Sequence, residues 1–474
     1  MSTDKVPTGT PWTWRLGIAG LVILLASSAY FAQPVIGPRG AAFVGVFCFF
    51  GLVATCSTNL RAVNWRTIGW GIALQCVLAL LVLKVPIVYE GFKVVGTGVK
   101  HFISFSDKGA AFVFGNLADA RPADKGGTWS VLFEKAHVEY LFQFAFVALP
   151  PILFVSAFFT VLYHFGILQF CVRLLARGMV YLLGTSGAET LSVSANVFMG
   201  QTEAPLIVRP YVPRMTNSEL FTLMTSGFAH ISGGMMVVYI NYGADPVAVL
   251  TTCVMACPGS LYLAKLFMPE TGVPETAGTL HQEKTKSPYV NAVDAAATGT
   301  RDGLTLALNV AAMLIVFIAF VAMFDALLGG IKPMLLGLGM ASDTLADWPD
   351  DLSLSMIFGW LFAPAAFLMG VDLDDIHKVG SLLGSKLAIN EHFAYLTMKK
   401  WLMNPDFMTP RSYRLAAFAL TGFANFASVG IQLGGIGAMA PERRHDLARL
   451  GGRALFVGFV ATLLNAAIAG VLLD

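Results

Sequence analysis

The chain has 474 residues, of which 56% are hydrophobic and only 13% are charged. A soluble fold of this size would lack enough polar residues to cover its surface, so the composition excludes an ordinary soluble protein and favours helices in lipid. The net charge of +2 is uninformative. The six cysteines form no CxxC pair and are typical of packing residues, so they predict no metal site. We also expect no cofactor and no nucleic-acid partner.

The N-terminal region has a polar tail over residues 1–13 and an apolar helix over residues 14–34. This apolar run is long for a secretory signal, and further membrane segments follow it. We therefore predict a cytoplasmic tail and a retained, additional N-terminal transmembrane helix.

Further apolar runs are long enough to cross a bilayer at ~1.5 Å rise per residue. They lie at residues 40–57, 68–89, 140–165, 220–242, 247–267, 304–328, 415–436 and 454–473. The sequence thus predicts an all-α polytopic membrane protein with about nine transmembrane helices. Residues 90–115 and 170–188 have the pattern of interfacial helices, and residues 268–303 are expected to form a cytoplasmic linker.

Basic residues orient this bundle. Lys5 and Arg15 precede the first helix, Arg61 and Arg66 follow the second, and further Lys and Arg residues cluster after residue 264 and before the last helix. With a cytoplasmic N-terminus these charges lie on one side, although the basic residues at 93–125 fall on the other. We expect a multi-pass protein of the cell inner membrane, surrounded by lipid, with a periplasmic C-terminus.

Two interrupted segments occur at corresponding places in the two halves of the chain. Residues 192–212 precede a complete helix at 220–242, and residues 356–401 precede a complete helix at 415–436. Internal duplication with broken segments indicates an inverted-repeat transporter whose binding site lies near the bilayer midplane. Irregular backbone survives in lipid only where protein or a wet cavity surrounds it.

Each interrupted segment carries a carboxylate, Glu203 in the first and Glu391 in the second. A charge at bilayer depth costs about 2.5 to 3.5 kcal/mol on insertion scales, so both groups need partners. We expect those partners to be substrate, cation or Lys386. The alternative is that the two glutamates pair with Arg209 or Lys386 and merely lock helices.

Several motifs in these segments resemble the concentrative nucleoside transporter family. They are GQTEAPLIVRPY from Gly200, FGWLFAPAAFLMGV from Phe358, GSKLAINE from Gly384 and GFANFASVGIQLGGIGAMAPERR from Gly422, with RAVNWRTIGWGIALQ at Arg61 and SDKGAAFVFG at Ser106. The resemblance covers most of the chain from about Gly40. The helix before it looks like an addition to the bacterial eight-helix arrangement.

The resemblance implies a homotrimer in which a scaffold holds a transport part with two re-entrant hairpins that face two broken helices. On this chain, residues 40–165 and 304–329 would form the scaffold. Residues 166–267 would contain the first hairpin, residues 350–404 the second, and residues 411–474 the last two helices. The implied function is nucleoside symport with Na+ or H+, in an elevator-like motion of the hairpin-bearing part.

The resemblance also implies a set of binding residues. The nucleobase would be read by Gln201, Thr202 and Glu203, and the ribose hydroxyls would be held by Glu391, Asn425 and Ser428. Phe423 and Met235 would pack against the nucleoside, although Phe423 taken alone is typical of helix packing. A ribose offers vicinal hydroxyl donors, which a carboxylate and an amide accept well. Pyrimidine or purine preference is not predicted.

The implied coupling site consists of Asn196, Met199, Ile231 and His230. In the sodium-coupled members a hydroxyl occupies the position of His230, and oxygen suits a hard cation better than imidazole nitrogen does. Our hypothesis is that His230 weakens sodium dependence or shifts coupling to protons. The alternative is that the imidazole turns away and Ser232 or Thr225 supplies the hydroxyl.

Two other functional classes compete with the transporter. An intramembrane enzyme could use Glu203 and Glu391 as acid and base, but no serine and histidine or metal constellation accompanies them. A channel would need a continuous polar pore lining rather than two hairpins. We therefore expect a transporter and not an enzyme.

Overall fold

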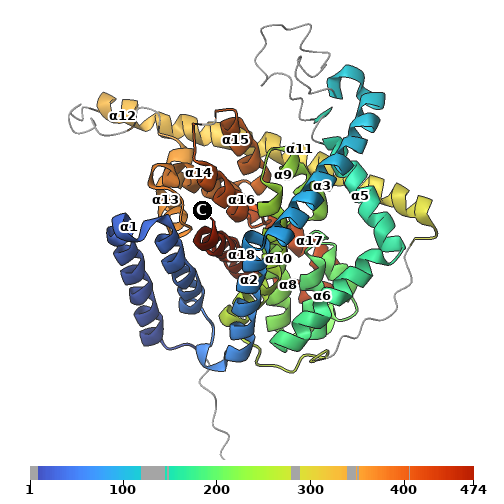
Figure 1. Cartoon of the computed structure of the whole chain (residues 1–474), viewed down its shortest axis with the longest axis horizontal. Helices are drawn as coiled ribbons and strands as arrows, with labels where there is room; N and C mark the ends of the chain where they lie inside the picture. Colours follow the sequence, from blue (N-terminus) through green and yellow to red (C-terminus); the bar gives the residue numbers. More distant parts are fainter. Residues whose placement is uncertain are drawn as a thin grey trace, which may run out of the picture.

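The computed structural model describes residues 9–118, 145–146, 149–278, 289–338, 349, 352–404 and 406–473. Helices make up nearly all of these ranges and surround the C-terminal helix α18 (Figure 1). One isolated bridge, between Ser186 and Ala277, is the β-pairing found in them. The predicted all-α fold is confirmed.

The first helix, α1 (Trp12–Thr55), consists of two antiparallel arms, which lie side by side at the left of Figure 1. The chain reverses at Gly37, where φ is 64°, a conformation that glycine adopts without steric cost. At the open end, the Thr10 backbone N–H donates to the Thr58 carbonyl at 3.0 Å. The two arms correspond to the predicted helices at 14–34 and 40–57.

The next helices follow in chain order. They are α2 (Trp65–Lys84), α3 (Pro86–Phe114), α5 (Leu149–His164) and α6 (Ile167–Leu183). Val85 alone lies between α2 and α3, and residues 165–166 lie between α5 and α6. The Asn64 side chain caps α2 by accepting from the backbone N–H of Arg66. Helix α3 covers the predicted amphipathic helix at 90–115, and α6 turns away from α5 by 75°. The start of the predicted helix at 140–165 lies mostly outside the described residues.

In the first half, α7 (Gly187–Ala195) begins at a capping box formed by Ser186 and Glu189. After α7 the chain runs through turns and two short 3-10 helices, Ala204–Val208 and Val212–Arg214, so the predicted interruption is present. The elements that follow are α8 (Asn217–Ala229), α9 (Gly233–Asn241) and α10 (Pro246–Phe267). The helix expected at 220–242 is interrupted, because residues 230–232 separate α8 from α9, but the two parts together are long and apolar enough to cross a membrane.

The second half combines two long helices with several short ones. It comprises α11 (Ala292–Gly329), α12 (Ile331–Gly337), α13 (Leu354–Leu368), α14 (Ile376–Ala388), α15 (Glu391–Leu402), α16 (Pro410–Leu420), α17 (Phe426–Met439) and α18 (Arg444–Leu472). The two long helices are α11 and α18. The helix expected at 415–436 is also interrupted, because it breaks at residues 421–425. The broken helices agree instead with the arrangement that the family resemblance implies. Helix α11 begins inside the segment expected to be a linker.

Six segments in the described ranges are long and apolar enough to cross a membrane, with α8 and α9 counted together as one of them and α11 and α12 as another. The bent pair α5 and α6 makes a seventh if it is one span. The nine predicted crossings exceed this number for two reasons. The two arms of α1 were predicted as two crossings but form one continuous helix in this count, and α16 and α17, which replace one predicted crossing, are each too short to span a membrane alone.

Helix α11 packs against α5 through a face of small residues. These residues recur every fourth position and are Ala295, Gly299, Gly303 and Ala307. Such spacing lets two helix backbones approach closely in lipid. The rest of α11 is largely exposed, and the helix runs along the upper edge of Figure 1, away from the central bundle around α18.

Candidate functional site

Three helices inside the bundle begin at polar residues that interrupt apolar sequence. Ser232 caps α9 by accepting from Met235 N–H at 3.3 Å, and Asn390 caps α15 by accepting from Phe393 N–H at 2.8 Å. Asn425 caps α17 in the same way, through the N–H of Ser428. Each cap satisfies a backbone donor that lipid could not, and each helix start carries a partial positive charge.

Glu391 is the first residue of α15 and is 4% exposed. Its Oε1 accepts from the Tyr239 hydroxyl at 2.8 Å, and its Oε2 accepts from the Asn425 side-chain amide at 2.9 Å. The positive end of α15 favours a negative charge at this position. A carboxylate offers about four lone-pair sites, so each oxygen keeps capacity for one more donor. The arrangement can therefore accept two adjacent hydroxyl groups.

Of the three partners expected for the glutamates, which were substrate, cation and Lys386, the lysine forms no direct ion pair with Glu391 in the described residues. Lys386 is fully buried, and its Nζ donates to the Ala419 carbonyl at 2.7 Å and to the Thr462 hydroxyl at 3.0 Å. The ammonium thus lies at the negative C-terminal end of α16, where a cation is stabilised. Arg209 is exposed. Within the described residues neither Glu203 nor Glu391 forms an ion pair with a lysine or arginine.

Gln201 links the first interrupted segment to α17. Its Nε2 donates to the Ser428 hydroxyl at 3.1 Å, and its Oε1 accepts from Gln432 Nε2 at 3.1 Å. The neighbouring Thr202 lies against Gly435, where a Cβ atom would come within 2.6 Å of the threonine methyl. The segment that contains Gln201 therefore packs directly on α17, and Asn425 at the start of α17 connects it to Glu391.

The structure does not bring Glu203 and Glu391 together in one cluster. The Glu203 residue is exposed, and its Oε2 accepts from the Gly200 backbone N–H at 2.9 Å. Gly200 itself lies beside Ser232 at the start of α9. Glu203 thus stands at the edge of the site rather than beside the buried carboxylate.

Met235 and Phe423 offer apolar surface near the same breaks. Met235 is 3% exposed and lies one turn before Tyr239 on α9. Phe423 is partly buried against the core, and its backbone N–H donates to the His230 carbonyl at 3.0 Å. The two breaks, at 230–232 and 421–425, are therefore in direct contact.

The candidate coupling residues lie around the end of α8. The Asn196 amide donates to the Ser226 hydroxyl at 3.0 Å, and His230 Nδ1 lies 2.9 Å from the Ser226 carbonyl. Met199 is partly buried and Ile231 is buried at the break. The Oδ1 of Asn196 and the hydroxyl of Thr225 are buried without a partner in the described part of the chain. An orphaned amide oxygen is suited to a hard cation.

Sequence reasoning missed Tyr239 and Gln432. Both lie four residues after a predicted site residue on the same helix, Tyr239 after Met235 and Gln432 after Ser428. Residues four apart lie on the same face of a helix, so this spacing could have indicated that Tyr239 and Gln432 face the site.

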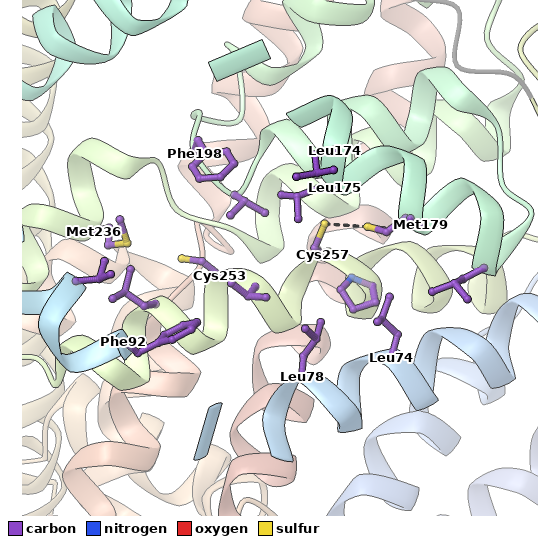
Figure 2. Close-up of a pocket in the computed structure, with 17 residues that line it drawn as sticks. Leu74, Leu78, Phe92, Leu174, Leu175, Met179, Phe198, Met236, Cys253 and Cys257 are labelled. Atoms are coloured by element: carbon purple, nitrogen blue, oxygen red, sulfur yellow. Dashed lines mark hydrogen bonds between the residues drawn. The ribbon is translucent and has the colours of Figure 1, made fainter. Parts of the chain in front are cut away.

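An apolar pocket of about 450 Å³ lies elsewhere, between α2, α3, α6 and α10 (Figure 2). Its wall includes Phe92, Phe198 and Met236, and the Cys257 thiol lies 3.2 Å from the Met179 sulfur. No charged residue lines it. A nucleoside needs several donors and acceptors, so this pocket does not suit such a ligand.

Three family models match the chain. They describe the C-terminus of Na+ dependent nucleoside transporters over residues 248–470, the N-terminus of the same proteins over residues 44–117, and a gate for nucleoside recognition over residues 145–245. Together these models cover most of the chain.

Similar proteins give the same picture. An uncharacterized transporter of Haemophilus influenzae is 37% identical over 91% of this chain and 97% of its own length. Sodium/nucleoside cotransporter 1 of Homo sapiens is 36% identical over 91% of this chain, which spans 63% of the human protein. The structure of CNTnw in an inward-facing substrate-bound state has a TM-score of 0.81 and 34% identity, over 91% of this chain and 97% of that one. The structure of a double variant of CNTnw in an outward-facing state has a TM-score of 0.82 and 34% identity, over 92% of this chain and 97% of that one.

The fold and these matches define a multi-pass membrane transporter, not an enzyme. The chain belongs to the concentrative nucleoside transporter family, whose models describe Na+-dependent nucleoside transport. The resemblance read from its motifs is confirmed.

Proposed function

We propose that this chain is a homotrimeric symporter of the cell inner membrane that imports nucleosides together with Na+. The observation that carries the proposal is the environment of Glu391, a buried carboxylate held by Tyr239 and Asn425 with accepting capacity left on both oxygens. A buried charge without a basic partner is costly, and a ligand that donates hydrogen bonds repays that cost.

The ribose is recognised by Glu391, with Asn425 and Ser428 beside it. Vicinal hydroxyls donate to the two carboxylate oxygens, and a site built this way rejects an analogue that lacks them. Gln201 and Thr202 contact the base, because both side chains come from the segment that packs on α17 at Ser428. Met235 and Phe423 cover the apolar faces, and Glu203 acts at the edge of the site.

Sodium binds where Asn196 faces the end of α8, with carbonyls from Met199 and Ile231. The buried, unpartnered Oδ1 of Asn196 supports an oxygen ligand set. The hydroxyl comes from Ser226, which already contacts Asn196, rather than from Ser232, which caps α9. His230 points its Nδ1 at the Ser226 carbonyl. The imidazole at a hydroxyl position is the feature that favours H+ as the alternative coupling ion.

Transport occurs by an elevator-like motion of the part that carries two re-entrant hairpins, built from α7 with the segment after it and from α14 with α15. The small-residue contact of α11 with α5, and the exposed apolar surface of α11, support a scaffold that also forms the trimer. CNTnw, which is similar to this chain, has been seen in both inward-facing and outward-facing states.

Uptake of labelled uridine into proteoliposomes tests the proposal. We expect saturable accumulation of unchanged uridine with an inward Na+ gradient and none when choline replaces Na+. Accumulation driven by a pH gradient alone, with rates that vary between about pH 5.5 and 7.5, would assign coupling to H+ instead. Absence of uphill uptake under every gradient would refute symport, and chemical change of the uridine would favour an enzyme.

Two hydroxyl variants test the cation site. Ser226→Ala should raise the Na+ concentration for half-maximal uptake, because it removes a ligand next to Asn196. Thr225→Val is the matched comparison, since the neighbouring Thr225 hydroxyl is buried but has no partner in the described residues. A larger effect of Thr225→Val would contradict the assignment of Ser226.

A further inference from the structure

We propose that Tyr239 is a positioning residue that orients Glu391 for the ribose and links it to the helix that begins at the cation site. This inference rests on the proposed function. It concerns a residue that contacts the carboxylate rather than the nucleoside.

Two different helices hold the two oxygens of the Glu391 carboxylate. Tyr239 is fully buried on α9 and donates to Oε1, while Asn425 at the start of α17 donates to Oε2. A carboxylate held at both oxygens cannot rotate about its terminal torsion without losing a charge-assisted hydrogen bond. Its remaining lone pairs therefore keep one orientation, as two hydroxyls at fixed spacing require.

The ring of Tyr239 is itself held in place. It stacks on Tyr395 with 4.3 Å between ring centroids and 16° between planes. Tyr395 is anchored by its hydroxyl, which donates to the Ala417 carbonyl at 3.0 Å and lies 2.8 Å from the Thr421 hydroxyl. The position of the Tyr239 hydroxyl thus follows from packing of α9 against α15 and the end of α16.

Helix α9 joins this contact to the coupling site. Its first residue, Gly233, donates its backbone N–H to the Phe198 carbonyl at 3.0 Å, two residues after Asn196. Tyr239 lies six residues further along α9, about 9 Å at the usual rise. A cation that orders residues 230–232 therefore fixes the start of α9 and, through one rigid helix, the hydroxyl on Glu391. Cation and nucleoside then raise each other's affinity by the same factor.

Binding of uridine and of 2′,3′-dideoxyuridine to purified full-length protein, with and without Na+, tests the inference. In Tyr239→Phe, which keeps the stacked ring, we expect the uridine Kd in Na+ to rise about tenfold, equal to about 1.4 kcal/mol. The Kd of dideoxyuridine should stay unchanged, so discrimination between the two ligands shrinks. The factor by which Na+ improves uridine binding should also fall.

The matched control is Tyr242→Phe on the same helix. The Tyr242 hydroxyl lies 3.0 Å from His392 Nε2 rather than on Glu391, so both discrimination and the Na+ effect should stay at the wild-type values. Equal weakening of both ligands by Tyr239→Phe, together with a lower Tm, would show a merely structural role and overturn the inference. An unchanged Na+ effect would overturn the link through α9. Failure of the wild-type protein to bind uridine would refute the proposed function instead.

Discussion

The backbone N–H of Phe423 donates to the carbonyl oxygen of His230 at 3.0 Å, which joins the break between α8 and α9 to the break between α16 and α17. A helix that stops inside a membrane leaves donors and acceptors that lipid cannot satisfy. Here each break supplies a partner to the other, and side-chain caps supply more. Because the two breaks satisfy each other in part, substitutions where they meet should affect both breaks together.

Gly422→Ala should destabilise the contact between the two helix breaks. Gly422 has a φ of 151°, and an added Cβ would lie 2.7 Å from the Thr462 methyl and 3.0 Å from the Phe228 carbonyl oxygen. We expect a loss of about 1 to 3 kcal/mol, visible as a lower Tm in detergent, together with reduced uptake. Gly434→Ala on α17 is the control, since its Cβ would meet open space. Equal Tm values for the two variants would contradict the prediction.

Glu391→Gln should reduce uridine uptake by about 100-fold, equal to about 3 kcal/mol or two charge-assisted hydrogen bonds. The amide keeps the size of the side chain but places a donor where Asn425 or a ribose hydroxyl also donates. Uptake in proteoliposomes and the Tm of the purified variant measure the effect. Normal transport by this variant would show that the ribose does not bind at Glu391.

Asn425→Ser separates the two roles of this residue. Serine can still cap α17, but its hydroxyl is too short to replace the amide that donates to Glu391 Oε2. We expect about tenfold weaker uridine binding with little change in Tm. Asn425→Ala removes the cap as well and should cost about 1 kcal/mol more in stability. If both variants bind uridine like the wild type, the Asn425 amide has no part in recognition.

Lys386→Met should lower stability more than it lowers nucleoside affinity. The variant leaves the Ala419 carbonyl without its buried donor, at a cost of about 1 to 3 kcal/mol. Lys400→Met is the control, because Lys400 is exposed. Tm and uridine Kd should be measured together. A lost affinity at unchanged Tm would mean that Lys386 acts through Glu391 after all.

Gly299→Ala should weaken the contact between α11 and α5 although alanine has the higher helix propensity. The new Cβ would lie 2.7 Å from the Ala157 Cα, a backbone atom that cannot move aside cheaply. Gly329→Ala near the end of α11 meets open space and should be neutral or slightly stabilising. Thermal unfolding of both variants measures the difference, and a stabilised Gly299→Ala would contradict the close packing.

The predictions from sequence were most accurate for features that lie close together in the chain. The interruptions after Asn196 and before Glu391 follow from polar and glycine residues inside apolar runs, and the structure has both. The hydropathy pattern does not indicate the breaks at His230 and Thr421, because both breaks are short and their neighbours in the sequence are apolar. Only the family motifs indicated that these helices are broken.

The sequence by itself determined that the chain is an all-α membrane protein of the nucleoside transporter family. Composition, apolar runs and motifs can be read along the chain without knowing which segments meet. Tertiary structure decided which buried groups meet. Lys386 lies five residues before Glu391 yet contacts Ala419 and Thr462, whereas Glu391 meets Tyr239 from the other half of the chain. Such partners depend on how the interrupted helices pack together. That packing is constrained because backbone donors and acceptors at the breaks need partners away from water.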